Sequence, residues 1–181
     1  MTTRLALVSL EHVHAGHYLS CLKNLVGIEL VAVAEPDQRR VSAHAGLLEG
    51  LAVVPDYREL LGHGYLDGVL ICSANSRHKA VVLDFARAKI PILCEKPIAT
   101  KCADARDMLA VCEAHEVPLG ICFPVRFSEP LRQAKRLVEH GALGQVVAVK
   151  ATNHGTMPED WFVEPQLSGG GAVMDHTVHV V

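Results

Sequence analysis

Residues 67–97 read DGVLICSANSRHKAVVLDFARAKIPILCEKP, and this stretch decides the fold. It contains two short apolar runs, Gly68–Cys72 and Ile90–Cys94, without the alternation of apolar and polar residues that marks a half-exposed strand. Between the runs, the apolar residues of Val81–Ala86 recur at the spacing of one helix face. The stretch therefore predicts a buried strand, a helix and a second buried strand parallel to the first.

The same alternation extends through the first two thirds of the chain. Further apolar runs of this kind are Leu5–Ser9, Glu29–Ala34, Leu51–Val54 and Val117–Cys122. Helical spacing follows the first run and precedes the last, at Tyr18, Cys21, Leu22 and Leu25 and at Ala105, Met108, Leu109 and Cys112. Strands that alternate with helices predict an α/β fold with a doubly wound parallel sheet, which we place in residues 1–123.

The pattern changes after Phe123, and we expect a second domain to begin at residue 124. An amphipathic helix over Leu131–Val138 ends at Gly141, and a strand-like run follows at Val146–Ala151. The last segment, Ala172–Val181, carries no stop signal and no polar tail. We therefore expect residues 124–181 to be the truncated start of an α/β domain, and the DNA beyond codon 181 to encode its continuation.

Composition and charge exclude several classes of protein. A formal net charge of −3 and a pI near 6.4 provide no basic surface for nucleic acid. The apolar runs are much shorter than the ~18 residues that suggest a membrane span. The six cysteines are scattered without a CxxC pair, which disfavours a zinc site or a disulfide framework. We expect a protein of the reducing cytoplasm, with neither nucleic acid nor membrane as a partner.

In a doubly wound sheet, ligands bind beyond the carboxyl ends of the strands. The turn after the first strand, Ser9–His14, lacks the three glycines that let a backbone approach a pyrophosphate, and Glu11 adds a negative charge. Taken alone, this turn predicts weak dinucleotide binding. Glu35 ends the second strand, where a carboxylate can accept hydrogen bonds from a ribose diol and repel a 2′-phosphate. A solvated turn is the alternative interpretation of Glu35.

Two later places also carry groups suited to catalysis. Glu95-Lys96-Pro97 follows a hydrophobic strand directly, which favours a functional lysine over a surface one. Asp175 and His179 have i, i+4 spacing and would share one face of a helix. An imidazole, with an ordinary pKa of ~6.5, suits proton transfer near neutral pH. The alternative for this pair is an exposed helix face without function.

A group of histidines near the first turn invites a metal interpretation. Of His12, His14 and His17, only the last two share a helix face. No carboxylate or cysteine completes a ligand set with the usual spacing. We therefore expect no metal site.

Several motifs, taken in order along the chain, resemble the Gfo/Idh/MocA oxidoreductase family, which includes glucose–fructose oxidoreductase and inositol dehydrogenase. The motifs are Asp67–His78, Glu95-Lys96-Pro97, Gly141–Val146, and Gly169–Gly171 followed by Asp175 and His179. The resemblance covers essentially the whole chain, and the combination is specific although each motif alone is weak. It implies an NAD(P)-binding Rossmann domain followed by an α/β domain with a large, mostly antiparallel sheet.

The resemblance also implies catalytic roles for three residues. Lys96 would be the catalytic lysine that contacts the reacting hydroxyl of the substrate. His179 would donate or accept the proton, and Asp175 would help to orient the substrate. The implied cofactor is NAD or NADP.

Residues that would bind this cofactor are implied in the same way. At the positions of the family's glycines the chain carries Ser9, Glu11 and His14. Glu35 would hold the adenosine ribose. The other implied cofactor-binding residues are Ser73, Asn75, His78, Glu95, Pro97 and Arg126.

The leading hypothesis is an NAD(P)-dependent oxidoreductase that transfers hydride at a secondary alcohol of a sugar, inositol or related polyol. Glu35 favours NAD over NADP, and the missing glycines predict weak binding. The alternative is a non-catalytic or truncated Rossmann relative that binds a nucleotide or a protein partner. We also expect a homo-oligomer, because a group of C-terminal valines lacks a covering sheet: Val173, Val178, Val180 and Val181.

Overall fold

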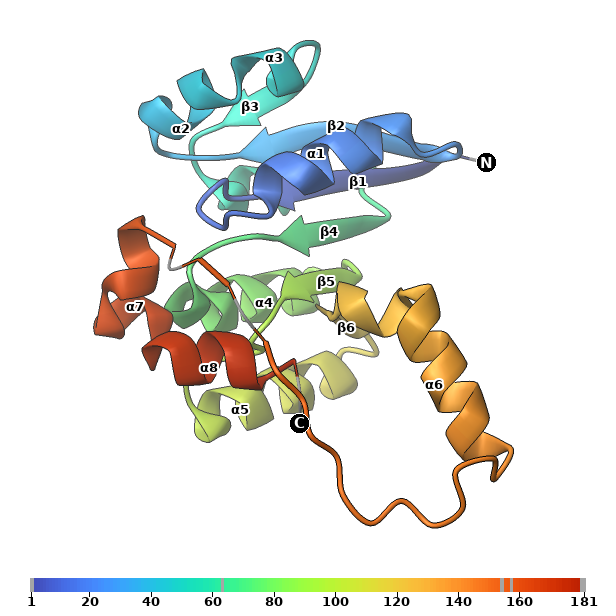
Figure 1. Cartoon of the computed structure of the whole chain (residues 1–181). Coiled ribbons are helices and arrows are strands. Elements are labelled where there is room, and N and C mark those ends of the chain that lie inside the picture. Colours follow the sequence, from blue (N-terminus) through green and yellow to red (C-terminus); the bar gives the residue numbers. More distant parts are fainter. Residues whose placement is uncertain (1, 63, 154, 157, 180–181) are drawn as a thin grey trace.

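The computed structural model describes residues 2–62, 64–153, 155–156 and 158–179. Its centre is a six-stranded sheet of order β3-β2-β1-β4-β5-β6, in which every neighbouring pair is parallel (Figure 1). The strands are β1 (Thr3–Val8), β2 (Ile28–Ala34), β3 (Ala52–Val54), β4 (Gly68–Ile71), β5 (Ile92–Glu95) and β6 (Leu119–Cys122). The predicted α/β fold with a doubly wound parallel sheet is confirmed.

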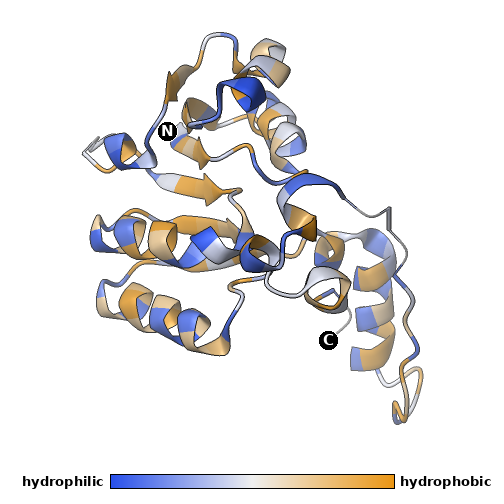
Figure 2. Ribbon diagram, turned by 90° about the vertical axis from the view of Figure 1, so that its left-hand side faces the viewer, coloured by the Kyte–Doolittle hydropathy of each residue, from blue (hydrophilic) through white to orange (hydrophobic). Residues whose placement is uncertain are grey.

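Helices cover both faces of the sheet, and this explains strands that are apolar without alternation. These helices are α1 (Ala15–Asn24), α2 (Gln38–Ala43), α3 (Ala45–Leu48), α4 (His78–Arg87) and α5 (Cys102–Ala114). Neighbouring residues of β1 enter separate cores, since Val8 packs in the cluster of Phe85 and Met108 whereas Leu7 packs in the cluster of Leu19. Figure 2 shows the strands as largely hydrophobic, between helices of mixed character.

The strand order reverses between β1 and β4. The chain moves outward from β1 to β3 and then returns to place β4 on the other side of β1 (Figure 1). The turns after these two strands meet at the carboxyl edge of the sheet, where the His12 backbone N–H donates to the Cys72 carbonyl at 2.9 Å. Such a reversal forms the crevice in which open α/β sheets bind their ligands.

Beyond β6, the described residues form helices and no strand. They are η3 (Pro124–Phe127), α6 (Glu129–Glu139), η4 (Asp160–Val163), α7 (Pro165–Ser168) and α8 (Gly171–Thr177). The amphipathic helix predicted here is α6, and Gly141 follows it with a φ of +69°. The strand predicted at Val146–Ala151 is wrong: Val147 is 89% exposed, and no strand in the described part of the chain lies beside it to take its backbone hydrogen bonds.

The segment from η4 to α8 folds back onto the carboxyl edge of the sheet. Trp161 and Phe162 pack in one cluster with Ala74, in the turn after β4. The Asn75 side-chain amide donates to the Ser168 carbonyl at 2.9 Å. These contacts bring the C-terminal part of the described chain to the crevice between β1 and β4.

Two expectations about surfaces can be compared with the structure. None of the helices that the structure describes has the length and apolar character needed to cross a membrane. Among the C-terminal valines, Val173 is exposed, whereas Val180 and Val181 lie outside the described residues.

Candidate active site

The turn after β1 adopts a conformation that glycine usually supplies. Ser9 has a φ of +70°, in the left-handed region that costs most residues free energy. Its hydroxyl accepts a hydrogen bond from the Glu11 backbone N–H at 3.1 Å and donates to the Glu35 carboxylate at 3.2 Å. The side chain of Ser9 thus stabilises the turn that the missing glycine would otherwise form.

Glu35, at the carboxyl end of β2, is fully buried. Besides the Ser9 hydroxyl, its carboxylate accepts the backbone N–H groups of Leu10 at 2.5 Å and Asp37 at 2.9 Å. The carboxylate therefore ties the turn after β1 to the end of β2. Binding of an adenosine ribose by Glu35 stays a prediction. The carboxylate already accepts hydrogen bonds from three donors, so the ribose would have to use its remaining acceptor position.

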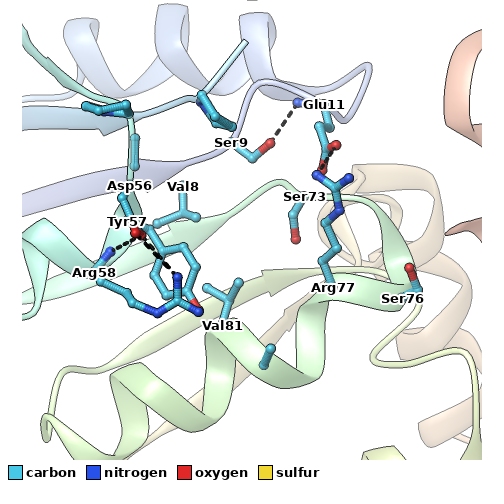
Figure 3. Close-up of a pocket in the computed structure, with 14 residues that line it drawn as sticks. Val8, Ser9, Glu11, Asp56, Tyr57, Arg58, Ser73, Ser76, Arg77 and Val81 are labelled. Atoms are coloured by element: carbon cyan, nitrogen blue, oxygen red, sulfur yellow. Dashed lines mark hydrogen bonds and ion pairs between the residues drawn. The ribbon is translucent and has the colours of Figure 1, made fainter.

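Glu11 reaches across the crevice to the turn after β4. Its carboxylate accepts the Ala74 backbone N–H at 2.8 Å. It also accepts the Arg77 guanidinium at 2.6 Å (Figure 3). The Trp161 indole N–H donates to the Glu11 carbonyl at 2.9 Å. Three segments far apart in sequence are thus joined at one residue.

A cavity of about 490 Å³ opens beside this turn (Figure 3). Its wall is mostly apolar, with Val8, Ala34 and Val81 among the lining residues. Ser73 contributes a buried hydroxyl oxygen that has no hydrogen-bond partner among the described residues. An apolar cavity with an unpaired polar atom in its wall is typical of a small-molecule site.

Glu95 ends β5 on the other side of the crevice and is fully buried. Its carboxylate accepts hydrogen bonds from His14 Nδ1 at 2.9 Å, from the Tyr18 hydroxyl at 2.6 Å and from the Lys96 backbone N–H at 2.9 Å. Burial alone would raise the pKa of Glu95, but the bonds from His14 and Tyr18, together with the charge of His12, lower it to about 2. Glu95 is therefore an anion that anchors helix α1.

Lys96, Asp175 and His179 come together at the end of β5. Lys96 is only 4% exposed, and its ammonium is paired with the Asp175 carboxylate of α8. His179 lies edge-on to the Phe123 ring, with 6.4 Å between ring centroids. Partial burial, followed by the Lys96 charge, lowers the pKa of His179 below its ordinary value of 6.5. His179 is therefore neutral at pH 7 and able to accept a proton; it shares the lining of a cavity of about 370 Å³ with Arg126.

The prediction that Asp175 and His179 share a helix face is wrong in one respect. Helix α8 ends at Thr177, so His179 lies in the turn that follows. Asp175 still pairs with Lys96, and the charges of both residues act on the His179 ring.

The other residues expected near the nicotinamide hold turns together in this structure. His78 is fully buried, and its ring nitrogens lie 3.0 Å from the carbonyls of Ser73 and Pro97, which joins the turns after β4 and β5. Asn75 bonds Ser168 through its amide nitrogen, whereas its buried side-chain oxygen is unpaired within the described chain. Contact of any of them with a cofactor stays a prediction.

Among the described residues, one set of side chains could hold a metal, and it joins two of the histidines noted in the sequence to Glu95. His12, His14 and Glu95 place one ligand atom each within 4.8 Å of the others, whereas His17 pairs with Cys21. However, His12 Nδ1 accepts the His14 backbone N–H at 3.2 Å, which leaves the ring proton on Nε2, the nitrogen that faces Glu95. A metal-bound histidine ordinarily donates through its other nitrogen, so this arrangement disfavours a metal.

The buried His12 ring makes the stability of the protein depend on pH. Burial lowers its pKa from 6.5 to about 4. Between these values the unfolded chain binds a proton that the folded chain does not, so the free energy of unfolding should fall as the pH is lowered from 6.5 to 4. The loss should reach about 3 kcal/mol. A further loss should follow between pH 4.5 and about 2, where Glu95 is protonated in the unfolded chain but still charged in the folded one.

Urea unfolding at a series of pH values measures this dependence. His12→Phe keeps a ring against Trp161 and Phe162 and should make the loss between pH 6.5 and 4 smaller. The buried His78, whose pKa is also lowered by burial, should account for part of the loss that remains. An unchanged slope in His12→Phe would show that other groups cause the loss.

Sequence reasoning missed two residues of the site. Trp161 is the chain's single tryptophan and is 1% exposed, and Tyr18 bonds the Glu95 carboxylate. A lone tryptophan within an otherwise polar, irregular stretch was the available signal, because so large an apolar side chain is usually buried.

Comparisons with known proteins agree with this arrangement. A family model described as "Oxidoreductase family, NAD-binding Rossmann fold" matches residues 8–123, and one described as "GFO/IDH/MocA C-terminal domain" matches residues 131–181. The rhizopine catabolism protein MocA of Rhizobium meliloti is 30% identical over 97% of this chain and 54% of its own length. A myo-inositol 2-dehydrogenase of Thermotoga maritima is 27% identical over 97% of this chain and 52% of its own length.

Solved structures share the fold. An NAD-binding protein from Listeria innocua superposes with a TM-score of 0.87 at 22% identity, covering 99% of this chain and 53% of that protein. The chain spans about half the length of the curated relatives it matches.

Proposed function

The chain belongs to the Gfo/Idh/MocA oxidoreductase family, and from this premise we propose that it supplies the nucleotide-binding part and the proton-transfer residues of an NAD(P)-dependent dehydrogenase. The proposed reaction is hydride transfer at a secondary alcohol of a sugar, inositol or related polyol. The observation that carries the proposal is the buried Lys96–Asp175 ion pair with His179 beside it.

In this proposal the three side chains act on the substrate hydroxyl. The Lys96 ammonium donates a hydrogen bond to the alcohol oxygen, and Asp175 holds the ammonium in place. Neutral His179 takes the alcohol proton, which its lowered pKa allows at and below pH 7. A nicotinamide, when bound, supplies the hydride acceptor.

The described residues fit a nucleoside of the dinucleotide better than its central pyrophosphate. The cavity of about 490 Å³ and the unpaired Ser73 hydroxyl suit a nucleoside. The position between β1 and β4, where a pyrophosphate would lie, is crossed by the Glu11 carboxylate. A pyrophosphate does not fit this arrangement unless Glu11 moves.

We expect NAD to bind more tightly than NADP. The cations nearest the end of β2 are already paired, Arg39 with Asp37 and Arg40 with several carboxylates including Glu35, so none is left to balance a 2′-phosphate. A preference of at least about tenfold should follow from that unbalanced charge. Calorimetric titration of both nucleotides measures it, and tighter binding of NADP would overturn the role given to Glu35.

A spectrophotometric assay tests the function itself. Reduced nicotinamide should form when NAD is incubated with the protein and a panel of inositols and sugars. A second candidate is a nucleotide-binding protein without catalysis, which the loss of the family's glycines from the turn after β1 favours. NAD binding with no turnover of any polyol would support that candidate, and absence of binding would contradict both.

Two properties of the whole protein belong to the same proposal. All six cysteines are free, which supports a reducing, cytoplasmic location. The apolar residues of α6, Leu131, Leu137 and Val138, are exposed and support self-association.

A further inference from the structure

The Glu11 carboxylate occupies a set of donors of the kind that bind phosphate. Its side chain is only 4% exposed. It accepts the Ala74 backbone N–H at 2.8 Å and the Arg77 guanidinium at 2.6 Å, and Arg40 approaches to 3.7 Å. A backbone N–H combined with guanidinium groups is an arrangement that recognises phosphate oxygens as readily as a carboxylate.

The position of these donors matters as much as their chemistry. Ala74 and Arg77 belong to the turn after β4, and Glu11 belongs to the turn after β1, so the carboxylate bridges the two walls of the crevice. Ser9, Ser73 and Arg77 line the cavity beside it (Figure 3). A nucleotide in that cavity would direct its phosphates toward the place that Glu11 fills.

Within the described part of the chain, the cations beside Glu11 are already paired with other carboxylates. Arg40, besides approaching Glu11, is paired with Asp160 at 2.8 Å and lies 3.7 Å from both Glu35 and Asp37. A diphosphate brought to the crevice would meet the Glu11 charge at close range without a free partner of its own. To bind there, the diphosphate must therefore displace the Glu11 carboxylate from the Ala74 N–H and the Arg77 guanidinium.

We propose that Glu11 is a built-in anion that competes with diphosphate-bearing nucleotides for the Ala74 N–H and Arg77, and that it thereby sets the nucleotide affinity of the crevice. The proposed function enters only in naming NAD as the ligand; the competition itself concerns any diphosphate. Removal of the Glu11 charge frees the Ala74 backbone N–H and the Arg77 guanidinium for the ligand.

Calorimetric titration of Glu11→Gln and Glu11→Ala with NAD, adenosine and inorganic pyrophosphate tests the proposal. Both variants should bind NAD and pyrophosphate at least about tenfold more tightly than the parent, because a repulsive charge at contact distance is removed. Adenosine affinity should stay within about twofold, since adenosine carries no phosphate. Glu113→Gln, the same charge change on the exposed surface of α5, should alter none of these affinities.

The outcomes separate this proposal from the proposed function. If folded Glu11 variants bind pyrophosphate no more tightly than the parent, the proposed competition by Glu11 is wrong. Tighter pyrophosphate binding without NAD binding in any variant would support the competition and contradict the dehydrogenase.

A second arm covers the case in which neither Glu11 variant folds. Arg77→Met in the parent leaves the Glu11 charge without its closest partner and should weaken pyrophosphate binding severalfold. Unchanged pyrophosphate affinity in Arg77→Met would contradict the proposal.

Discussion

Replacement of Lys96 by methionine is expected to lower turnover by about 10²–10⁴-fold while NAD affinity stays within about threefold of the parent. Methionine has a similar length and fills the same buried space, but it removes the ammonium that is paired with Asp175. The loss should therefore appear in kcat, because in the proposed function the ammonium contacts the reacting oxygen and not the nucleotide. The rate is measured on the full protein, with the inositol or sugar that gives the fastest turnover in the spectrophotometric assay.

Lys79→Met is the matched control for this experiment. Lys79 also pairs with carboxylates, Asp104 at 2.7 Å and Asp107 at 2.6 Å, but on the outer surface of α4 and α5. It should leave turnover unchanged. If Lys96→Met keeps turnover within a few-fold of the parent, the lysine has a structural role only. A separate variant, His179→Ala, should slow the reaction and remove the fall in rate at acid pH.

Trp161→Ala should release the C-terminal segment from the sheet. Truncation of a buried tryptophan typically costs about 3–5 kcal/mol. In this chain the substitution should destabilise the docking of residues 158–179 on the sheet. Trp161 packs on Ala74 and bonds the Glu11 carbonyl, and both residues lie in turns of the sheet domain. Amide hydrogen exchange in α7 and α8 should accelerate strongly, while β1 and β4 keep their protection.

Trp161→Phe separates packing from hydrogen bonding in the same experiment. It retains an aromatic ring beside Phe162 but loses the indole N–H, so its effect should be near 1 kcal/mol. Unchanged exchange in α8 of Trp161→Ala would show that the Lys96–Asp175 pair and the Asn75–Ser168 bond suffice to hold the segment.

The sheet could be predicted from sequence because both of its faces are buried. Gly68–Cys72 contains the whole of β4, and Ile90–Cys94 overlaps β5 but misses its last residue, Glu95. Apolar residues dominate a strand that is covered on both faces, so the run marks the strand but not a charged residue at its carboxyl end. Helix faces are harder to predict from sequence. The predicted face of α1 included Leu25, but the helix begins at Ala15 and buries Ala15 and Leu19, which leaves Leu25 half exposed at its end. Partial exposure of apolar residues makes a face ambiguous in sequence.

The candidate site could be predicted only in part, for a different reason. Lys96, Asp175 and His179 were indicated by a strand end, a spacing and a family resemblance. The course of the Glu11 side chain toward Ala74 and Arg77 depends on contacts between residues more than 60 positions apart, and its bond to Trp161 spans 150. No local pattern encodes such contacts. The strand predicted at Val146–Ala151 is wrong for the same reason, because a strand depends on its neighbour.

The single tryptophan is an intrinsic fluorescence probe of the protein. The Trp161 indole lies against the turn after β4 and bonds the Glu11 carbonyl, so its emission reports on the crevice and on the docking of the segment that carries it. A ligand that shifts Glu11 changes the surroundings of the indole directly. Nucleotide binding can therefore be followed on the unlabelled chain, and the wavelength of its emission distinguishes a docked C-terminal segment from a released one.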